Sequence, residues 1–176
     1  ELVRVLRLLA NICSTIQPLR LEVARQHLSE AMAICEQTSM PSERIEVLSK
    51  LGEVLALDGE FELADAYLTE CVDFLKRAGD RNSLAIANIN LYTLWMNRQD
   101  FARALQYSQE SLRLFESLTP VNPFHASVAL LRVGDSYLAL NNHHSAKSAW
   151  SEGLKYANKA QHPRQMQVLS ERISKL

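Results

Sequence analysis

Four segments of the chain repeat one pattern of large and small residues, and this repetition limits the possible folds more than any other feature. It is clearest in residues 51–78, where two stretches of apolar residues at helical spacing are separated by a short turn. Gly52 precedes Ala64 by 12 residues, and Gly134 precedes Ala146 by the same number. The sequence therefore predicts pairs of helices that fold back on each other, arranged in tandem.

The small residues have a packing role in this prediction. Two antiparallel helices approach closely only where small residues meet large ones, so Gly52, Ala64 and Cys71 are expected to make room for Leu55 and Leu68. The other units repeat the pattern with variations, with their defining residues at Leu9-Ala10, Leu91-Tyr92 and Val133-Gly134. In the third unit a Tyr replaces the small residue, so its packing is expected to differ locally.

These motifs resemble the tetratricopeptide signature, in which Leu-Gly on a first helix is followed by Ala, a large residue and a small residue on a second helix. The interval from Gly52 to Tyr92 is 40 residues and that from Tyr92 to Gly134 is 42, against 34 in the common form. Long repeats of this kind are similar to those of kinesin light chain, LGN/Pins-like adaptors and MalT-type regulators. The resemblance implies an all-α, TPR-like α-solenoid of about four antiparallel helix hairpins plus a C-terminal helix.

The pattern predicts one superhelical domain that covers residues 1–176. The expected units are residues 1–39, 41–79, 81–118 and 122–160, followed by a C-terminal helix over 163–176. Asp80, Asp100 and Asn122 are expected to cap helices. In the first unit the interval before Ala24 is two residues longer, which predicts an insertion around Gln17-Pro18. The chain begins within a helical pattern, so we expect it to be a fragment of a longer protein.

Composition excludes several classes of protein. The sequence contains no apolar run near the ~20 residues that a membrane span requires. The net charge of −1 gives no reason to expect direct nucleic-acid binding. The charge is uneven, however, because residues 1–88 carry 9 Lys/Arg and 14 Asp/Glu, and residues 89–176 carry 10 and 6. An odd number of dispersed cysteines fits a reducing compartment, so a cytoplasmic or nuclear location is expected.

No motif in the sequence indicates catalysis, a cofactor or a metal. The five Gly residues are isolated and form no phosphate-binding loop. His143 and His144 are adjacent in a predicted turn and point apart, so they are not expected to bind metal. Trp95 and Trp150 are interpreted as packing residues, and Cys71 as a buried structural thiol. We therefore expect a protein that is not an enzyme.

The resemblance implies a binding surface on the first helix of each unit, which lines the concave side of such a superhelix. Asn90 and Asn97 could hold a peptide backbone, because an amide side chain both donates and accepts hydrogen bonds. Ile86, Ile89 and Leu131 could form an apolar floor or could simply pack against the neighbouring hairpin. The full set of candidates carried over by position is Arg7, Asn11, Lys50, Glu53, Ile86, Ile89, Asn90, Thr93, Asn97, Leu131, Arg132 and Asp135.

These observations favour a non-catalytic protein–protein interaction module that binds a peptide or helical segment of a partner in its concave groove. One alternative is an effector-sensing regulatory domain of the MalT type, with Asn90, Thr93 and Arg132 lining a closed pocket. Another is a structural segment of a longer solenoid with no ligand of its own. The apolar faces at the two ends also make self-association through the terminal helices an expectation.

Overall fold

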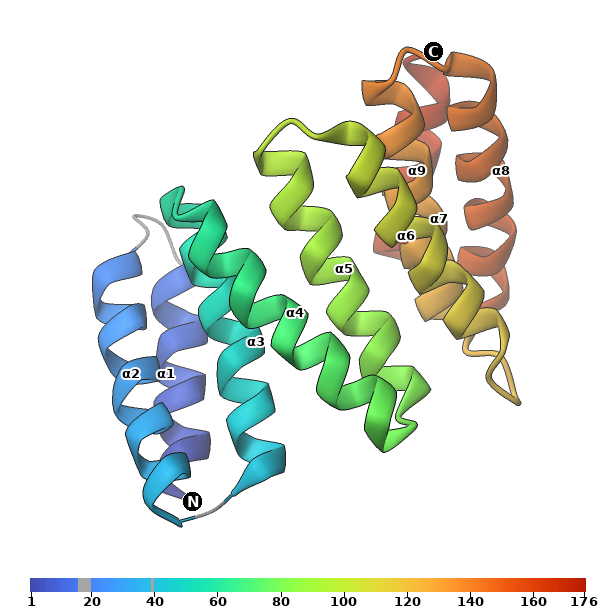
Figure 1. Ribbon diagram of the computed structural model, residues 1–176. Helices are drawn as coiled ribbons and strands as arrows, with labels where there is room; N and C mark the ends of the chain where they lie inside the picture. The colour runs from blue at the N-terminus through green and yellow to red at the C-terminus, as the bar shows by residue number, and fades with distance from the viewer. Residues whose placement is uncertain (16–19, 39) are drawn as a thin grey trace. The chain divides into compact units, whose positions relative to one another are not determined.

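The computed structural model describes residues 1–15, 20–38 and 40–176, and the predicted insertion at Gln17-Pro18 lies outside them. Within these residues the secondary structure consists of α-helices joined by short connections, and there is no strand (Figure 1). The helices, in chain order, are α1 (Leu2–Thr15), α2 (Leu21–Thr38), α3 (Pro41–Asp58), α4 (Phe61–Ala78), α5 (Arg81–Asn97), α6 (Phe101–Glu116), α7 (Pro123–Ala139), α8 (His143–Lys159) and α9 (Pro163–Ser174). The predicted all-α hairpin architecture is confirmed.

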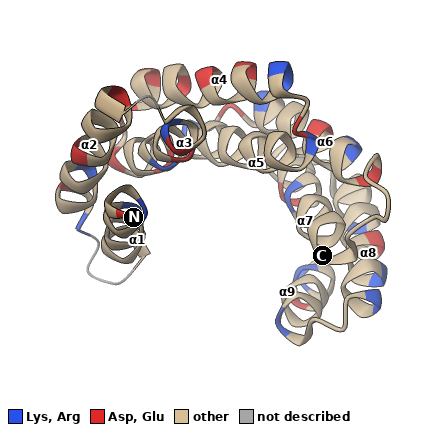
Figure 2. Cartoon of the chain, turned by 90° about the horizontal axis from the view of Figure 1, so that it is seen from below, with Lys and Arg blue, Asp and Glu red and all other residues tan. Residues whose placement is uncertain are grey.

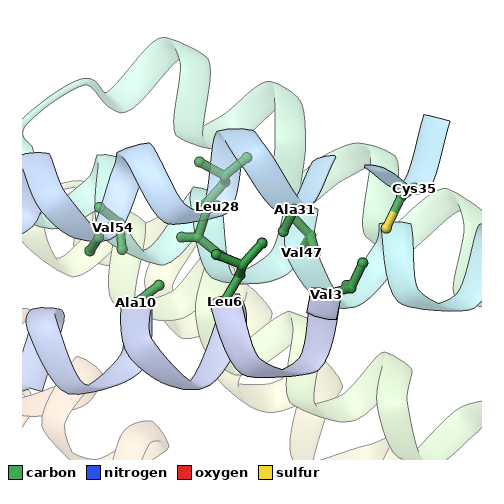
Figure 3. Close-up of a cluster of buried hydrophobic side chains, with 10 residues drawn as sticks. Val3, Leu6, Ala10, Leu28, Ala31, Cys35, Val47 and Val54 are labelled. Atoms are coloured by element: carbon green, nitrogen blue, oxygen red, sulfur yellow. The ribbon is translucent and has the colours of Figure 1, made fainter. Parts of the chain in front are cut away.

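The contacts divide the chain into two compact units, Glu1–Arg77 and Ala78–Leu176, which we call unit 1 and unit 2. Unit 1 contains α1 to α4, and unit 2 contains α5 to α9. In unit 1, α1, α2 and α3 all contact one another. Their shared core consists of aliphatic and small side chains from all three helices, including Val3, Leu6, Ala10, Leu28, Ala31, Cys35, Val47 and Val54 (Figure 3).

The fourth helix of unit 1 packs against α3 through the predicted small–large pairs. A Cβ atom built on Gly52 would lie 2.5 Å from Cγ of Leu68, so only glycine fits there. Cys71 is fully buried, and its thiol donates a hydrogen bond to the carbonyl of Ile45 at 3.5 Å. Gly59 ends α3 in the left-handed conformation at φ 86°, where a residue with a side chain would be strained.

Unit 2 consists of two layers of helices. The first helices α5, α7 and α9 form one layer, and the second helices α6 and α8 form the other (Figure 2). Leu131 of α7 is buried with Trp150 of α8 and Leu169 of α9, which ties the two layers together at this end. The layered arrangement places one face of α5, α7 and α9 away from the second helices.

The predicted caps fix where the helices of unit 2 begin. The Asp80 carboxylate accepts a hydrogen bond from the backbone N–H of Ser83 at 3.0 Å, and Asp100 accepts one from Arg103 at 3.1 Å. Asn122 accepts from the backbone N–H of Phe124 at 3.0 Å, directly before Pro123 at the first helical position. Each cap satisfies an N–H group that has no partner within the helix.

Candidate partner-binding surface

The candidate residues in unit 1 lie on α1 and α3, and the structure pairs their charges. Arg7 of α1 forms an ion pair with Glu46 of α3, and Lys50 forms one with Glu53 a helical turn later. Asn11 is exposed on α1. Because these cations already face carboxylates, this part of the surface offers little net charge to a ligand.

The α5 candidates in unit 2 follow one face of the helix at spacings of three and four residues. Ile86 and Asn97 are exposed, and Ile89, Asn90 and Thr93 are half-buried between them. The Thr93 hydroxyl donates a hydrogen bond to the backbone carbonyl of Ile89 at 3.1 Å, so its donor is used within α5. The face is therefore a mixture of apolar side chains and amides along the length of α5.

Leu131 does not lie on this face. Only 8% of its surface is exposed, and it packs with Ala146, Trp150 and Leu169 in the core between α7, α8 and α9. The backbone carbonyl of Leu131 also accepts a hydrogen bond from Nε1 of Trp150 at 3.3 Å. Of the two roles considered for this residue, the structure places it in packing between hairpins.

Asp135 of α7 is the centre of a charge cluster formed by Tyr92, Arg132, Asp135 and Arg172. Nε of Arg172, on α9, lies 3.1 Å from Oδ1 of Asp135. Burial raises the pKa of Asp135 above its ordinary value, and the positive charges of Arg172 and Arg132 partly offset this effect. The carboxylate thus forms an ion pair with Arg172 of the neighbouring first helix and also feels the positive charge of Arg132 on its own helix.

Arg132 belongs to the same cluster and lies one helical turn before Asp135 on α7, where it reaches the Tyr92 ring of α5. Its guanidinium lies 5.5 Å from the centre of the Tyr92 ring, within the range of a cation–π interaction. Nε of Arg132 is shielded from solvent and has no hydrogen-bond partner among the described residues. Burial, followed by the charge of Asp135, raises the pKa of Tyr92 to about 12, so the phenol remains protonated and able to donate.

Tyr92 and Arg172 are functional candidates that the sequence reasoning missed. Arg172 lies 40 residues after Arg132, the same interval as the repeat, and this spacing was the available signal. The sequence pattern marks Tyr92 only as a replacement for the expected small residue. In the structure the Tyr92 side chain is 4% exposed. Ser108, the small residue on the facing helix α6, is fully buried, and its hydroxyl lies 3.5 Å from the hydroxyl of Ser136 on α7.

A pocket lies in unit 1 between the end of α2 and the start of α3. It has a volume of about 400 Å³ and is lined by Cys35, Glu36, Met40, Pro41 and Arg44. The Arg44 guanidinium already forms an ion pair with Glu70 at 2.6 Å. Burial raises the pKa of the Cys35 thiol, which disfavours the reactive thiolate, so the pocket offers neither an unpaired cation nor an activated nucleophile. In the described part of the chain no three His, Cys, Asp or Glu residues are placed to hold a metal ion.

The comparisons with known proteins support the fold. No family model and no curated protein matches the sequence. Among solved structures, the crystal structure of BtubC (BKLC) from P. vanneervenii is similar, with a TM-score of 0.78 and 17% sequence identity. The fold is a TPR-like α-solenoid. The match covers 91% of this chain and 65% of BtubC, so the chain corresponds to less than two thirds of that protein. None of the helices in the described residues is long and apolar enough to cross a membrane.

Proposed function

We propose that the protein is a non-catalytic interaction module that holds a segment of a partner protein on the first-helix face of unit 2. The observation that carries this proposal is the charge cluster beside the mixed apolar and amide face of α5. Helical-repeat folds present such faces as extended surfaces, and extended surfaces suit a chain segment better than a small molecule.

The α5 face supplies contacts that do not depend on charge. Ile86 is 43% exposed, which leaves apolar area that an aliphatic or aromatic anchor of a partner could cover. The exposed amide of Asn97 lies on the same face, three helical turns further along. Such an amide can bond either a donor or an acceptor of a peptide backbone, so the face can hold an extended or helical segment.

The charge cluster defines the kind of side chain that the segment would carry. The cluster contains two guanidinium groups and one carboxylate, so its net charge is about +1. Arg172 is 44% exposed and remains accessible beside Asp135. An acidic side chain of the partner would form charge-assisted hydrogen bonds with these groups, which are stronger than neutral ones. We therefore infer a partner segment with an acidic residue near an apolar anchor.

The proposal is tested by comparing variants of the full chain in a pull-down from native extract. Ile86→Glu places a charge on an exposed position of the face, and Arg132→Gln removes one positive charge from the cluster. Gln106→Glu changes an exposed residue of α6, on the second-helix layer, and is the matched control. Circular dichroism establishes that each variant is folded.

We expect a partner that is retained by the wild type and by Gln106→Glu and is lost with both face variants. A partner retained equally by all four proteins would exclude this face as the binding surface. Loss of the partner with Gln106→Glu alone would move the surface to the layer of α6 and α8.

A further inference from the structure

The first helix of the chain exposes an apolar stripe that we call the α1 stripe, formed by Leu2, Val5, Leu9 and Ile12. The exposed fractions of these side chains run from 40% at Leu9 to 56% at Leu2. They follow one another at intervals of three and four residues, so they lie on one side of the helix. The neighbouring Leu8 is 54% exposed as well. Together with the buried side of α1, the stripe leaves only a narrow polar sector around Arg4 and Asn11.

The repeat register shows what normally covers this stripe. Ala10 and Gly52 hold equivalent positions 42 residues apart, which aligns Val5, Leu9 and Ile12 of α1 with Val47, Leu51 and Val54 of α3. The three residues of α3 are 0%, 6% and 1% exposed. They belong to the core that α3 shares with α2, which is the second helix of the hairpin before it. In α3 this side of the helix is therefore covered by a second helix.

The same relationship recurs in unit 2. The equivalent residues of α7 are Ala129, Val133 and Ser136, and all three are buried. Val133 packs with apolar residues of α6, and the hydroxyl groups of Ser136 and Ser108 lie 3.5 Å apart across the α6–α7 contact. Two independent units thus cover this side of a first helix with the second helix of the preceding hairpin.

An uncovered first helix does not need to be apolar, as α9 shows. This helix has no following helix packed on it among the described residues. Its exposed residues are mostly polar and include Arg164, Gln167, Ser170, Glu171 and Ser174. The exposed side of α9 is thus mostly polar, whereas the exposed stripe of α1 is apolar.

We propose that the α1 stripe is the docking site of an amphipathic α-helix of the repeat type, with a large aliphatic residue between small ones, as in α2. Leu28 of α2, flanked on its buried face by Ala24 and Ala31, is the pattern that covers α3 in unit 1. A helix with this pattern fits the stripe because α1 and α3 present the same type of side chain at the same register. The site lies in unit 1 and does not depend on the surface of unit 2.

The test uses the full chain and a synthetic helix as the probe. The probe is a fluorescent peptide of residues 21–38 in which Gln26→Lys forms a lactam bridge with Glu30, because isolated helices of this length are only marginally stable. Both bridged positions are exposed in α2. The matched control peptide carries Leu28→Glu. The protein variants are the double change Val5→Gln/Leu9→Gln, a second pair Leu2→Gln/Ile12→Gln, and the control Arg4→Gln.

We expect saturable binding by fluorescence anisotropy, at least tenfold weaker for both stripe variants and for the control peptide, and within about twofold for Arg4→Gln. Circular dichroism shows whether each double variant is folded. Because two independent double variants are used, the test can still be carried out if one of them misfolds. Equal binding to the stripe variants, or binding no stronger than that of the control peptide, would overturn the proposal. A stripe-dependent dimer in sedimentation velocity that the probe does not dissociate would also overturn it, because the occupant would then be a second copy of the chain.

Discussion

A Cβ atom placed on Gly134 would lie 2.2 Å from Nε1 of Trp150. No real Cβ atom approaches another atom so closely, so α7 and α8 are in contact because α7 has no side chain at this point. The indole is 1% exposed and donates to the carbonyl of Leu131, which leaves the ring little freedom to move. The fourth hairpin is thus fixed by one small residue and one large residue.

The first prediction concerns this contact. Gly134→Ala should lower the free energy of unfolding by about 1–3 kcal/mol through overpacking, even after the helix propensity gain of roughly 1 kcal/mol from replacing Gly by Ala. Urea denaturation followed by circular dichroism measures the change. The matched control is Gly153→Ala, where the nearest atom to a new Cβ is Cβ of Leu130 at 3.2 Å, so the expected loss is smaller. Equal losses at the two positions would contradict the packing argument.

The second prediction concerns the start of α5. Asp80 accepts hydrogen bonds from Ser83, and these bonds lower the pKa of its carboxyl. Asp80→Ala should cost about 1 kcal/mol of stability. Because the folded pKa is lowered, the contribution of ionised Asp80 is present at neutral pH and is lost as the pH falls below the ordinary Asp value of about 4. Asp80→Asn keeps an acceptor at the cap, so its stability should depend less on pH in this range; an unchanged dependence would rule out the capping role.

The helical hairpins could be predicted from the sequence because their signals are local. Small residues at fixed offsets, such as Gly52 and Ala64, determine how closely two neighbouring helices approach. Asp is a favoured N-cap residue wherever a helix begins, so the cap at Asp100 could be recognised without knowledge of the tertiary structure. The predicted caps Asp80 and Asn122 are confirmed for the same reason. The division of the contacts into two compact units was not predicted, because the repeat motifs report only local packing within a hairpin.

The candidate surface was harder to predict because it depends on side-chain direction and on pairs from different helices. Position alone left two roles open for Leu131, and only its burial against Trp150 and Leu169 assigns it to the core. Position identified Asp135 but not its partner Arg172, which lies on the next first helix. The α1 stripe was visible only as helical spacing, and its exposure required the packing of α2 and α3 on the other side of α1.

The third prediction concerns the three cysteines. Cys35 and Cys71 are buried, and burial raises the pKa of Cys71 to about 12, so its reactive thiolate is scarce at neutral pH. Cys13 is half-buried on α1. Titration of the native protein with a thiol reagent at pH 7.5 should modify Cys13 first, and all three thiols should react rapidly only in denaturant. The variant Cys13→Ser is the control, and rapid reaction of that variant in its native state would contradict the burial of the other two.

The last prediction concerns the pH dependence of the charge cluster. Burial raises the folded-state pKa of Asp135, so its ionised form is disfavoured in the folded protein, and this unfavourable contribution is fully present at neutral pH. The contribution disappears as the pH falls through the raised pKa towards the ordinary Asp value of about 4. The variant Asp135→Asn cannot ionise at this position. The difference in the free energy of unfolding between this variant and the wild type should therefore favour the variant more at pH 7 than at pH 4.

Chemical denaturation at pH 7, 6, 5 and 4 measures that difference, and Asp80→Asn provides the control because its pKa is shifted in the opposite direction. For Asp80→Asn the difference from the wild type should become more favourable to the variant as the pH falls. The carboxyl carbon of Asp135, followed by NMR, should titrate with a midpoint above about 4. A midpoint below this value would mean that the pairs with Arg172 and Arg132 outweigh burial, and the cluster would then favour the charged state of Asp135.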